Sequence, residues 1–207
     1  SKVASERAVA ESGLKYWAIV RQSFQIPNNP IAADYPIVAH MPQDTYGERM
    51  DAESSGNLMV QICLNAPENF WRYGYHMGGG EDQRFDQYSY VKALHGNARA
   101  GWSPKWLATK NYHGCYFTDS DDLNEIVPYR LKDRAQFLKD ELMNQIKLVK
   151  SKPRMTPEEV EAKNKRIARK PGGTLWAIEN NNEETIRVLW GSREKYDAIP
   201  ENWEDIP

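Results

Sequence analysis

A short acidic run, Asp119-Ser120-Asp121-Asp122, combines the residue type and the spacing that a metal ion would need. Carboxylate oxygens are ligands that Mg²⁺ prefers, and a bound Mg²⁺ activates water and stabilises charge during phosphodiester hydrolysis. The run also follows a segment that we expect to be a strand. Asp and Ser are equally suited to a turn or a helix cap. One hypothesis is therefore a metal-dependent hydrolase centred on Asp119, Asp121 and Asp122, with a simple cap as the alternative.

A basic run between Asn144 and Gly173 has the chemistry to bind phosphate groups or an acidic protein surface. It contains nine basic residues and three acidic ones, a net charge of +6, so the rest of the chain carries −8 of the total of −2. Clustered Lys and Arg bind nucleic acid with an affinity that falls steeply with salt. The predicted binding residues are Lys147, Lys150, Lys152, Arg154, Lys163, Lys165, Arg166, Arg169 and Lys170.

Stacking on bases would have to come from outside this basic run, which has almost no aromatic residues. The sequence offers three aromatic and three basic residues close together for that role: Trp102, Trp106, Tyr112, Arg99, Lys105 and Lys110. The charge of −8 on the rest of the chain opposes long-range attraction to nucleic acid. Nucleic acid, an acidic protein partner and plain solvation therefore all remain open for the run.

Other motifs do not indicate a cofactor. The closest pairing of soft metal ligands is His113-x-Cys115, whereas a structural zinc site shows two such pairs. Gly78-Gly79-Gly80 is followed by Glu81 and Asp82, which repel phosphate, so we interpret the glycines as a flexible turn. Neither a nucleophile elbow nor a dinucleotide fingerprint is present. We expect no cofactor, and the sequence favours a non-enzymatic role.

Composition is that of a soluble globular protein, with 40% apolar and 27% charged residues among 207. The longest apolar runs, such as Leu58-Met59-Val60, fall far short of the ~20 residues that span a bilayer. Two cysteines, Cys63 and Cys115, are too few for a disulfide framework. We therefore expect an intracellular, reducing compartment: the cytoplasm, or an organelle interior if a targeting segment has been removed.

The first half of the chain predicts one helix, one long extended segment and several strands. The first 24 residues show a helical apolar stripe. Residues 26–56 hold four prolines and predict an extended surface segment, because proline is excluded from helix interiors and central strands. Strands are expected at 58–64, 70–77 and 113–118, and a helix at 83–94.

The second half predicts two helices, a hairpin and a tail. An amphipathic helix of about 20 residues is expected from Pro128. Thr156, Pro157 and Glu159 form a capping box that predicts the start of a largely solvated helix. Residues 174–179 and 185–190 predict a hairpin across Asn180-Asn181-Asn182. The acidic tail, 192–207, is expected to be irregular, with Trp203 as a docking anchor.

Together these elements predict a single α+β domain, 1–207. Its small, mostly antiparallel sheet would be covered by the N-terminal helix and the long amphipathic helix. Residues 26–56, 150–172 and 192–207 would be appendages. For function the sequence favours a non-catalytic interaction or structural subunit of a larger assembly, with one or more protein partners. The alternatives are a nucleic-acid-binding protein that uses residues 147–170 and the hydrolase described above.

Overall fold

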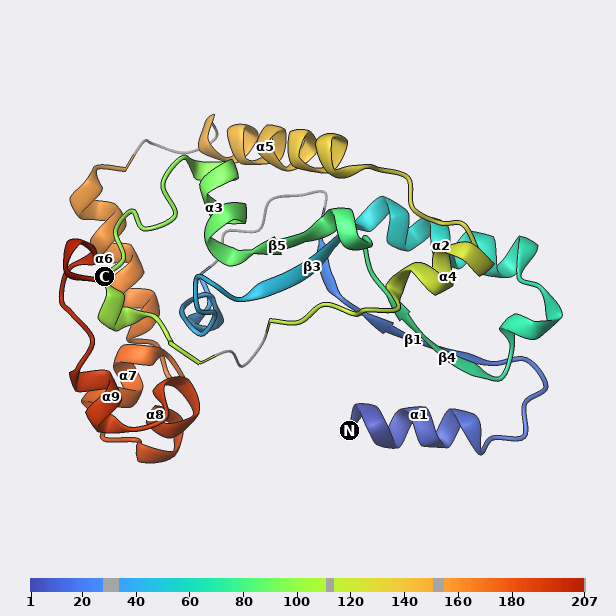
Figure 1. The fold of residues 1–207 in the computed structure, drawn as a ribbon, viewed down its shortest axis with the longest axis horizontal. Helices are drawn as coiled ribbons and strands as arrows, with labels where there is room; N and C mark the ends of the chain where they lie inside the picture. The colour runs from blue at the N-terminus through green and yellow to red at the C-terminus, as the bar shows by residue number, and fades with distance from the viewer. Residues whose placement is uncertain (28–33, 111–113, 151–154, 207) are drawn as a thin grey trace. The chain divides into compact units, whose positions relative to one another are not determined.

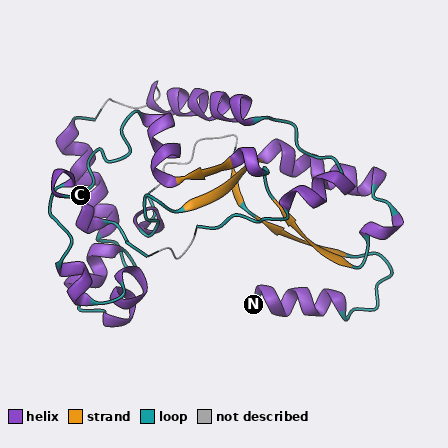
Figure 2. Cartoon of the chain, in the orientation of Figure 1, coloured by secondary structure: helices purple, strands orange, loops and turns teal. Residues whose placement is uncertain are grey.

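The computed structural model describes residues 1–27, 34–110, 114–150 and 155–206 of the 207-residue chain. Helices dominate, and short strands form one sheet of two strands and another of three (Figure 2). The protein therefore belongs to the α+β class, as predicted. In the ranges just given, none of the helices is long and apolar enough to cross a membrane.

The chain divides into two compact units, each assembled from three separate stretches of sequence. We call them the sheet unit and the helical unit, after the elements that dominate each. The sheet unit comprises Ser1–Asn29, Gly47–Phe85 and Cys115–Glu141, and the helical unit comprises Pro30–Tyr46, Asp86–Gly114 and Leu142–Pro207. Our expectation of a single domain with appendages stays a prediction.

Two strand pairs are parallel: β1 with β4, and β2 with β3. The third strand of the second sheet, β5, lies beside β3. Strand directions are mixed, and not mostly antiparallel as expected. The strands are β1 (Ala18–Gln22), β2 (Phe24–Ile26), β3 (Tyr46–Asp51), β4 (Tyr73–Met77) and β5 (Arg84–Asp86).

The sheet unit holds α1, α2 and α4, with α4 packed against β4 (Figure 1). Its core is apolar and continuous, and includes Met50 of β3, Leu58 of α2 and Met77 of β4. The helices here are α1 (Lys2–Ala10), α2 (Ala52–Asn65), α4 (Ser120–Ile126) and the first half of α5 (Arg134–Lys150).

The strand predicted at 58–64 is wrong, because this apolar run lies within α2. Asp51 begins the helix: its carboxylate accepts a hydrogen bond from the Ser54 backbone N–H at 2.9 Å. Leu58 and Ile62 then lie one turn apart and face the core. An apolar run of seven residues fits a buried strand or a helix face equally well, and here the cap decides.

The helical unit packs α7 against α6 and α8, and α8 against α9. Its largest core cluster includes Ile186, Leu189 and Trp190. The helices are α3 (Gln87–His95), α6 (Pro157–Ala168), α7 (Thr174–Glu179), α8 (Glu183–Trp190) and α9 (Arg193–Asp197), and the short 3-10 helices are η1 (Pro36–Ala39), η4 (Pro104–Trp106) and η5 (Trp203–Asp205).

The predicted hairpin is also wrong, because residues 174–179 and 185–190 are helical. The Asn182 side chain accepts from the Thr185 backbone N–H at 3.0 Å and so caps α8. The three asparagines therefore join two helices. The capping box at Thr156 is confirmed, since Thr156 and Glu159 satisfy each other's backbone donors. The helix predicted at 83–94 is confirmed as α3, shifted by a few residues.

Five further expectations differ from the structure. The N-terminal helix ends at Ala10, and Gly13 follows with a φ of +74° before β1. Within 26–56, the described residues include η1, all of β3 and the start of α2, and every residue of β3 except Tyr46 is buried. The long helix begins at Arg134. The tail is not wholly irregular, because it contains α9 and η5. Of the predicted strand at 113–118, residue 113 lies outside the described residues and 114–118 form no strand.

Candidate functional site

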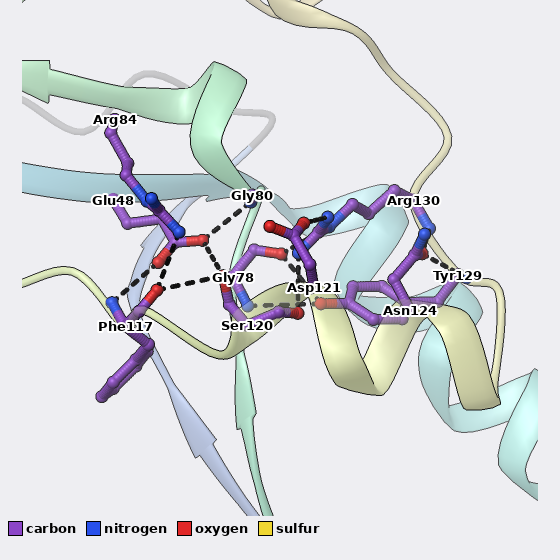
Figure 3. Close-up of polar contacts among 10 residues, drawn as sticks. All are labelled: Glu48, Gly78, Gly80, Arg84, Phe117, Ser120, Asp121, Asn124, Tyr129 and Arg130. Atoms are coloured by element: carbon purple, nitrogen blue, oxygen red, sulfur yellow. Dashed lines mark hydrogen bonds and ion pairs between the residues drawn. The ribbon is translucent and has the colours of Figure 1, made fainter.

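A buried carboxylate of the sheet unit is surrounded by polar contacts from several segments (Figure 3). Glu48 of β3 is fully buried, and its two oxygens accept three hydrogen bonds. The Gly80 backbone N–H donates at 2.7 Å, the Phe117 backbone N–H at 3.0 Å and the Ser120 hydroxyl at 2.6 Å. Buried polar groups need such partners. Glu48 therefore fixes two loops and the start of α4 against β3.

The glycine loop is part of this arrangement and is not the flexible turn that we expected. Gly78 and Gly80 are buried. A Cβ at Gly78 would overlap the Glu48 carboxylate, and one at Gly79 would overlap the Arg49 carbonyl. Gly80 has a φ of +87°, which favours glycine. The glycines are needed because backbone and carboxylate approach each other too closely for side chains.

Arg130 closes the other side of the loop (Figure 3). Its Nε donates to the Gly78 carbonyl at 2.9 Å and its Nη2 to the Ser120 carbonyl at 2.7 Å, while Nη1 forms an ion pair with Asp121. The Tyr129 hydroxyl also donates to the Gly78 carbonyl, at 2.8 Å. Burial raises the pKa of this Tyr129 hydroxyl. The guanidinium is thus committed to holding the glycine loop.

An open cleft of about 300 Å³ adjoins the loop. Its cations are paired within the chain: Arg130 with Asp121, and Lys132 with Glu53 and Asp140 at 2.9 and 2.8 Å. The other charged residues that line it are the acids Glu81, Asp82 and Asp133. The cleft is therefore net negative, which agrees with our exclusion of a phosphate-binding loop here.

The acidic run at 119–122 is divided between two pairings. The Asp119 carboxylate lies 2.9 Å from Nδ1 of His76, and Asp121 pairs with Arg130. Asp122 is exposed in the first turn of α4. Throughout the described ranges, no three His, Cys, Asp or Glu side chains are grouped closely enough to hold a metal ion. The structure therefore does not gather Asp119, Asp121 and Asp122 into one centre.

His76 belongs to a network of polar side chains that no sequence pattern predicted. Its Nε2 lies 3.4 Å from the Arg21 guanidinium, which also binds both oxygens of Glu6. An arginine only donates, so Nε2 acts as the acceptor and Nδ1–H donates to Asp119. The His76 ring stacks on Phe117 at 4.2 Å. This network links α1 to the β1–β4 sheet.

The predicted basic residues fall into three groups. Lys147 and Lys150 are exposed at the end of α5, while Lys152 and Arg154 lie outside the described residues. The remaining five lie on or just after α6, which is packed into the helical unit through Ile167 and Ala168. The set on and after α6 consists of Lys163, Lys165, Arg166, Arg169 and Lys170.

Two of these cations form ion pairs within the unit. Arg169 contacts Glu179 at 2.7 Å, and Lys170 contacts Asp34 at 3.0 Å. The hydrogen bond from Lys170, assisted by the charges of Arg166 and Lys163, lowers the pKa of Asp34. The basic surface around α6 is thus partly neutralised by the chain itself.

Helix α2 is apolar on two sides, which the sequence did not reveal because we expected a strand there. Opposite the buried Leu58, three apolar side chains remain exposed: Met59 at 46%, Val60 at 51% and Leu64 at 73%. With two further exposed residues they follow the i, i+3, i+4, i+7, i+8 spacing of one helix face. This α2 face consists of Gly56, Met59, Val60, Cys63 and Leu64.

Comparison with known proteins does not assign this chain to a family. A scan of protein-family models finds none that matches this chain, and a search of curated proteins likewise finds no match. The polar groups around Glu48 are engaged with one another, whereas the α2 face is uncovered within the described residues.

Proposed function

We propose that this protein is a non-catalytic interaction subunit of a larger assembly, and that the α2 face binds an uncharged, apolar helix of a partner protein. The observation that carries the proposal is the exposure of Met59, Val60 and Leu64 along one helix face. Contiguous exposed apolar surface is typical of protein interaction sites.

The lack of charge along most of α2 indicates what kind of partner surface would fit it. Between Glu53 and Glu68 the chain has no charged residue at all. An uncharged partner face suits such a helix, since a charge buried against it would have no counter-ion. Gly56 lies on the face with open space where a side chain would be, which allows a partner backbone to approach closely.

The energetic scale fits a binding face. Full burial of a Leu, Val or Met side chain contributes about 1.5–3 kcal/mol relative to exposure. Three such residues would supply the apolar centre of an interface, although a stable complex buries roughly 800 Å² per partner. Contacts beyond α2 are therefore expected in the complex.

The proposal is tested with tagged full-length protein expressed in its source cells. We expect the wild type to elute from gel filtration as a stoichiometric complex and Leu64→Glu to elute as the free chain, whose mass without the tag is 23.9 kDa. Val3→Glu is the matched control, since Val3 is 71% exposed on α1, away from this face. Identical profiles for wild type and Leu64→Glu would refute the proposal, and a concentration-dependent dimer of the purified chain would identify a second copy as the partner instead.

A second candidate, binding of single-stranded nucleic acid, is favoured by one observation in the helical unit. The Lys165 ammonium of α6 lies 5.5 Å from the centre of the Trp106 ring, so the basic helix and the aromatic segment meet. Residues 87–118 contain four basic and no acidic residues. Cations beside flat rings suit a strand that offers phosphates and bases.

The hydrolase remains the third hypothesis, and no observation favours it. Asp119 pairs with His76 and Asp121 pairs with Arg130, so the two carboxylates have different partners. Calorimetry tests it: the hypothesis requires that the wild type binds a divalent ion and that Asp121→Ala weakens this binding.

A further inference from the structure

The acidic end of the chain lies across the basic and aromatic segment of the helical unit. The Trp203 indole N–H donates to the Trp102 carbonyl at 2.7 Å, and the Arg99 guanidinium lies 4.3 Å from the centre of the Trp203 ring. The Lys105 ammonium contacts the Glu201 carboxylate at 2.9 Å. Trp203 thus serves as the docking anchor that the sequence suggested.

The tail segment 201–205 resembles a nucleic-acid strand in two features, negative charge and a flat ring. Glu201, Glu204 and Asp205 supply negative charge, and Trp203 supplies a flat ring. The Arg99 guanidinium also lies 5.2 Å from the centre of the Tyr88 ring, so it contacts two aromatic rings, those of Tyr88 and Trp203. A guanidinium stacks on a base as it does on an indole.

The segment is attached only at the surface. Trp203 is half-buried, the residues on either side of it are exposed, and η5 buries no residue. Ile199, just before Pro200, is the last residue that packs against the apolar core of the unit. Segments with few buried apolar contacts open at low free-energy cost.

The covered surface continues onto α6. The Asn164 amide donates to the Ala100 and Gly101 carbonyls at 3.3 and 3.0 Å, which holds the 99–105 loop against the helix. A Cβ at Gly101 would lie 2.8 Å from Val160, so the contact is close. On the same helix, the Lys165 ammonium adds a further cation beside the Trp106 ring.

We propose that Arg99, Trp102 and Lys105 form part of a binding surface for single-stranded nucleic acid, and that Glu201–Asp205 act as a latch that occupies this surface in cis. The latch rests on the second candidate function. Binding of a strand displaces the tail, and the tail's acids weaken binding until it is displaced.

The test measures fluorescence anisotropy of a labelled 20-nucleotide oligothymidylate with the full-length chain. The latch variant combines Trp203→Ala, Glu201→Gln, Glu204→Gln and Asp205→Asn. We expect it to bind about tenfold more tightly than wild type, because three negative charges and one competing ring are removed. Adding Arg99→Ala and Lys105→Ala should abolish that gain.

A charge-matched control removes three exposed acids elsewhere: Glu11, Glu125 and Glu184. If this control gains as much affinity as the latch variant, the latch is wrong. Equal binding by wild type and latch variant overturns the latch but leaves nucleic-acid binding in place. No binding by either overturns both. If the latch variant binds a labelled peptide of residues 200–206 but not the oligonucleotide, the surface is one for acidic protein segments and the nucleic-acid assignment is refuted.

Discussion

Glu48 shows how one buried side chain can organise three distant parts of a sequence. Its carboxylate accepts from Gly80, Phe117 and Ser120, which are 32, 69 and 72 residues further along the chain. No local pattern predicts such a centre. The only sequence signal was the run of three glycines, and its physical cause, the close approach of Glu48 to the loop, requires the fold to be known.

Replacing Glu48 with Gln should strongly destabilise the protein. The amide keeps one acceptor oxygen but turns an NH₂ group toward donors, which leaves the backbone N–H of either Gly80 or Phe117 without its acceptor. We expect a loss of about 2–4 kcal/mol in the free energy of unfolding, against about 1 kcal/mol for Ser120→Ala. Urea denaturation of both variants measures this, and equal losses would contradict the central role of the carboxylate.

Lys132 should set part of the pH dependence of stability. Burial alone would lower its pKa, but the carboxylates of Asp140 and Glu53 outweigh burial and raise it, while Lys132 lowers the pKa of Asp140. Because the pKa of the Asp140 carboxyl is lower in the folded protein, its ionised form stabilises the fold at every pH above the unfolded pKa of about 3.9. This stabilisation is lost as the pH falls through the lower, folded pKa.

Lys132→Met should therefore lose about 2 kcal/mol at pH 7, because three carboxylates are left without their shared cation. The difference from wild type should shrink as pH falls below about 4. Urea denaturation at pH 7, 5, 4 and 3 tests this, with Lys110→Met as the control because Lys110 is exposed. A difference that stays constant down to pH 3 would show that these pairings do not stabilise the fold.

At the scale of elements, prediction succeeded where the signal was local. The helix at 157–168 follows from its own capping box, so its start could be predicted from four residues. The runs at 58–64, 174–179 and 185–190 are short and apolar, and their spacing fits a strand or a helix. Ile186 and Trp190, for example, share a face in both. Asp51 caps the helix that holds the first run and Asn182 caps the helix that holds the third, whereas α7 has no side-chain cap and depends on tertiary packing.

Removing the cap should loosen α6 without unfolding the protein. Thr156→Ala loses the hydrogen bond to the Glu159 backbone N–H, at 3.3 Å, and should cost about 1 kcal/mol. Hydrogen exchange should speed up in the first turn of α6, whereas Thr109→Ala, an exposed loop change, should leave it unaltered. Unchanged exchange at α6 would mean that packing alone holds its start.

For the whole molecule, the net charge of −2 conceals two unlike parts, as the sequence indicated. The structure refines this picture, because cations on and after α6 are partly paired with Glu179 and Asp34, and Lys105 with Glu201. Among the described residues, an exposed apolar helix face lies on α2 of the sheet unit. Sequence reasoning could not find that face, since its residues share a side of the chain only in a helix.

The central claim, that a partner covers α2, is tested most directly by differential alkylation. Cys63 lies in the α2 face and Cys115 outside it, and both thiols are free and exposed. In the purified chain both should react with iodoacetamide. In native extract, quantified by mass spectrometry, Cys63 should be protected while Cys115 still reacts. Equal labelling of Cys63 in the extract and in the purified chain would contradict the account.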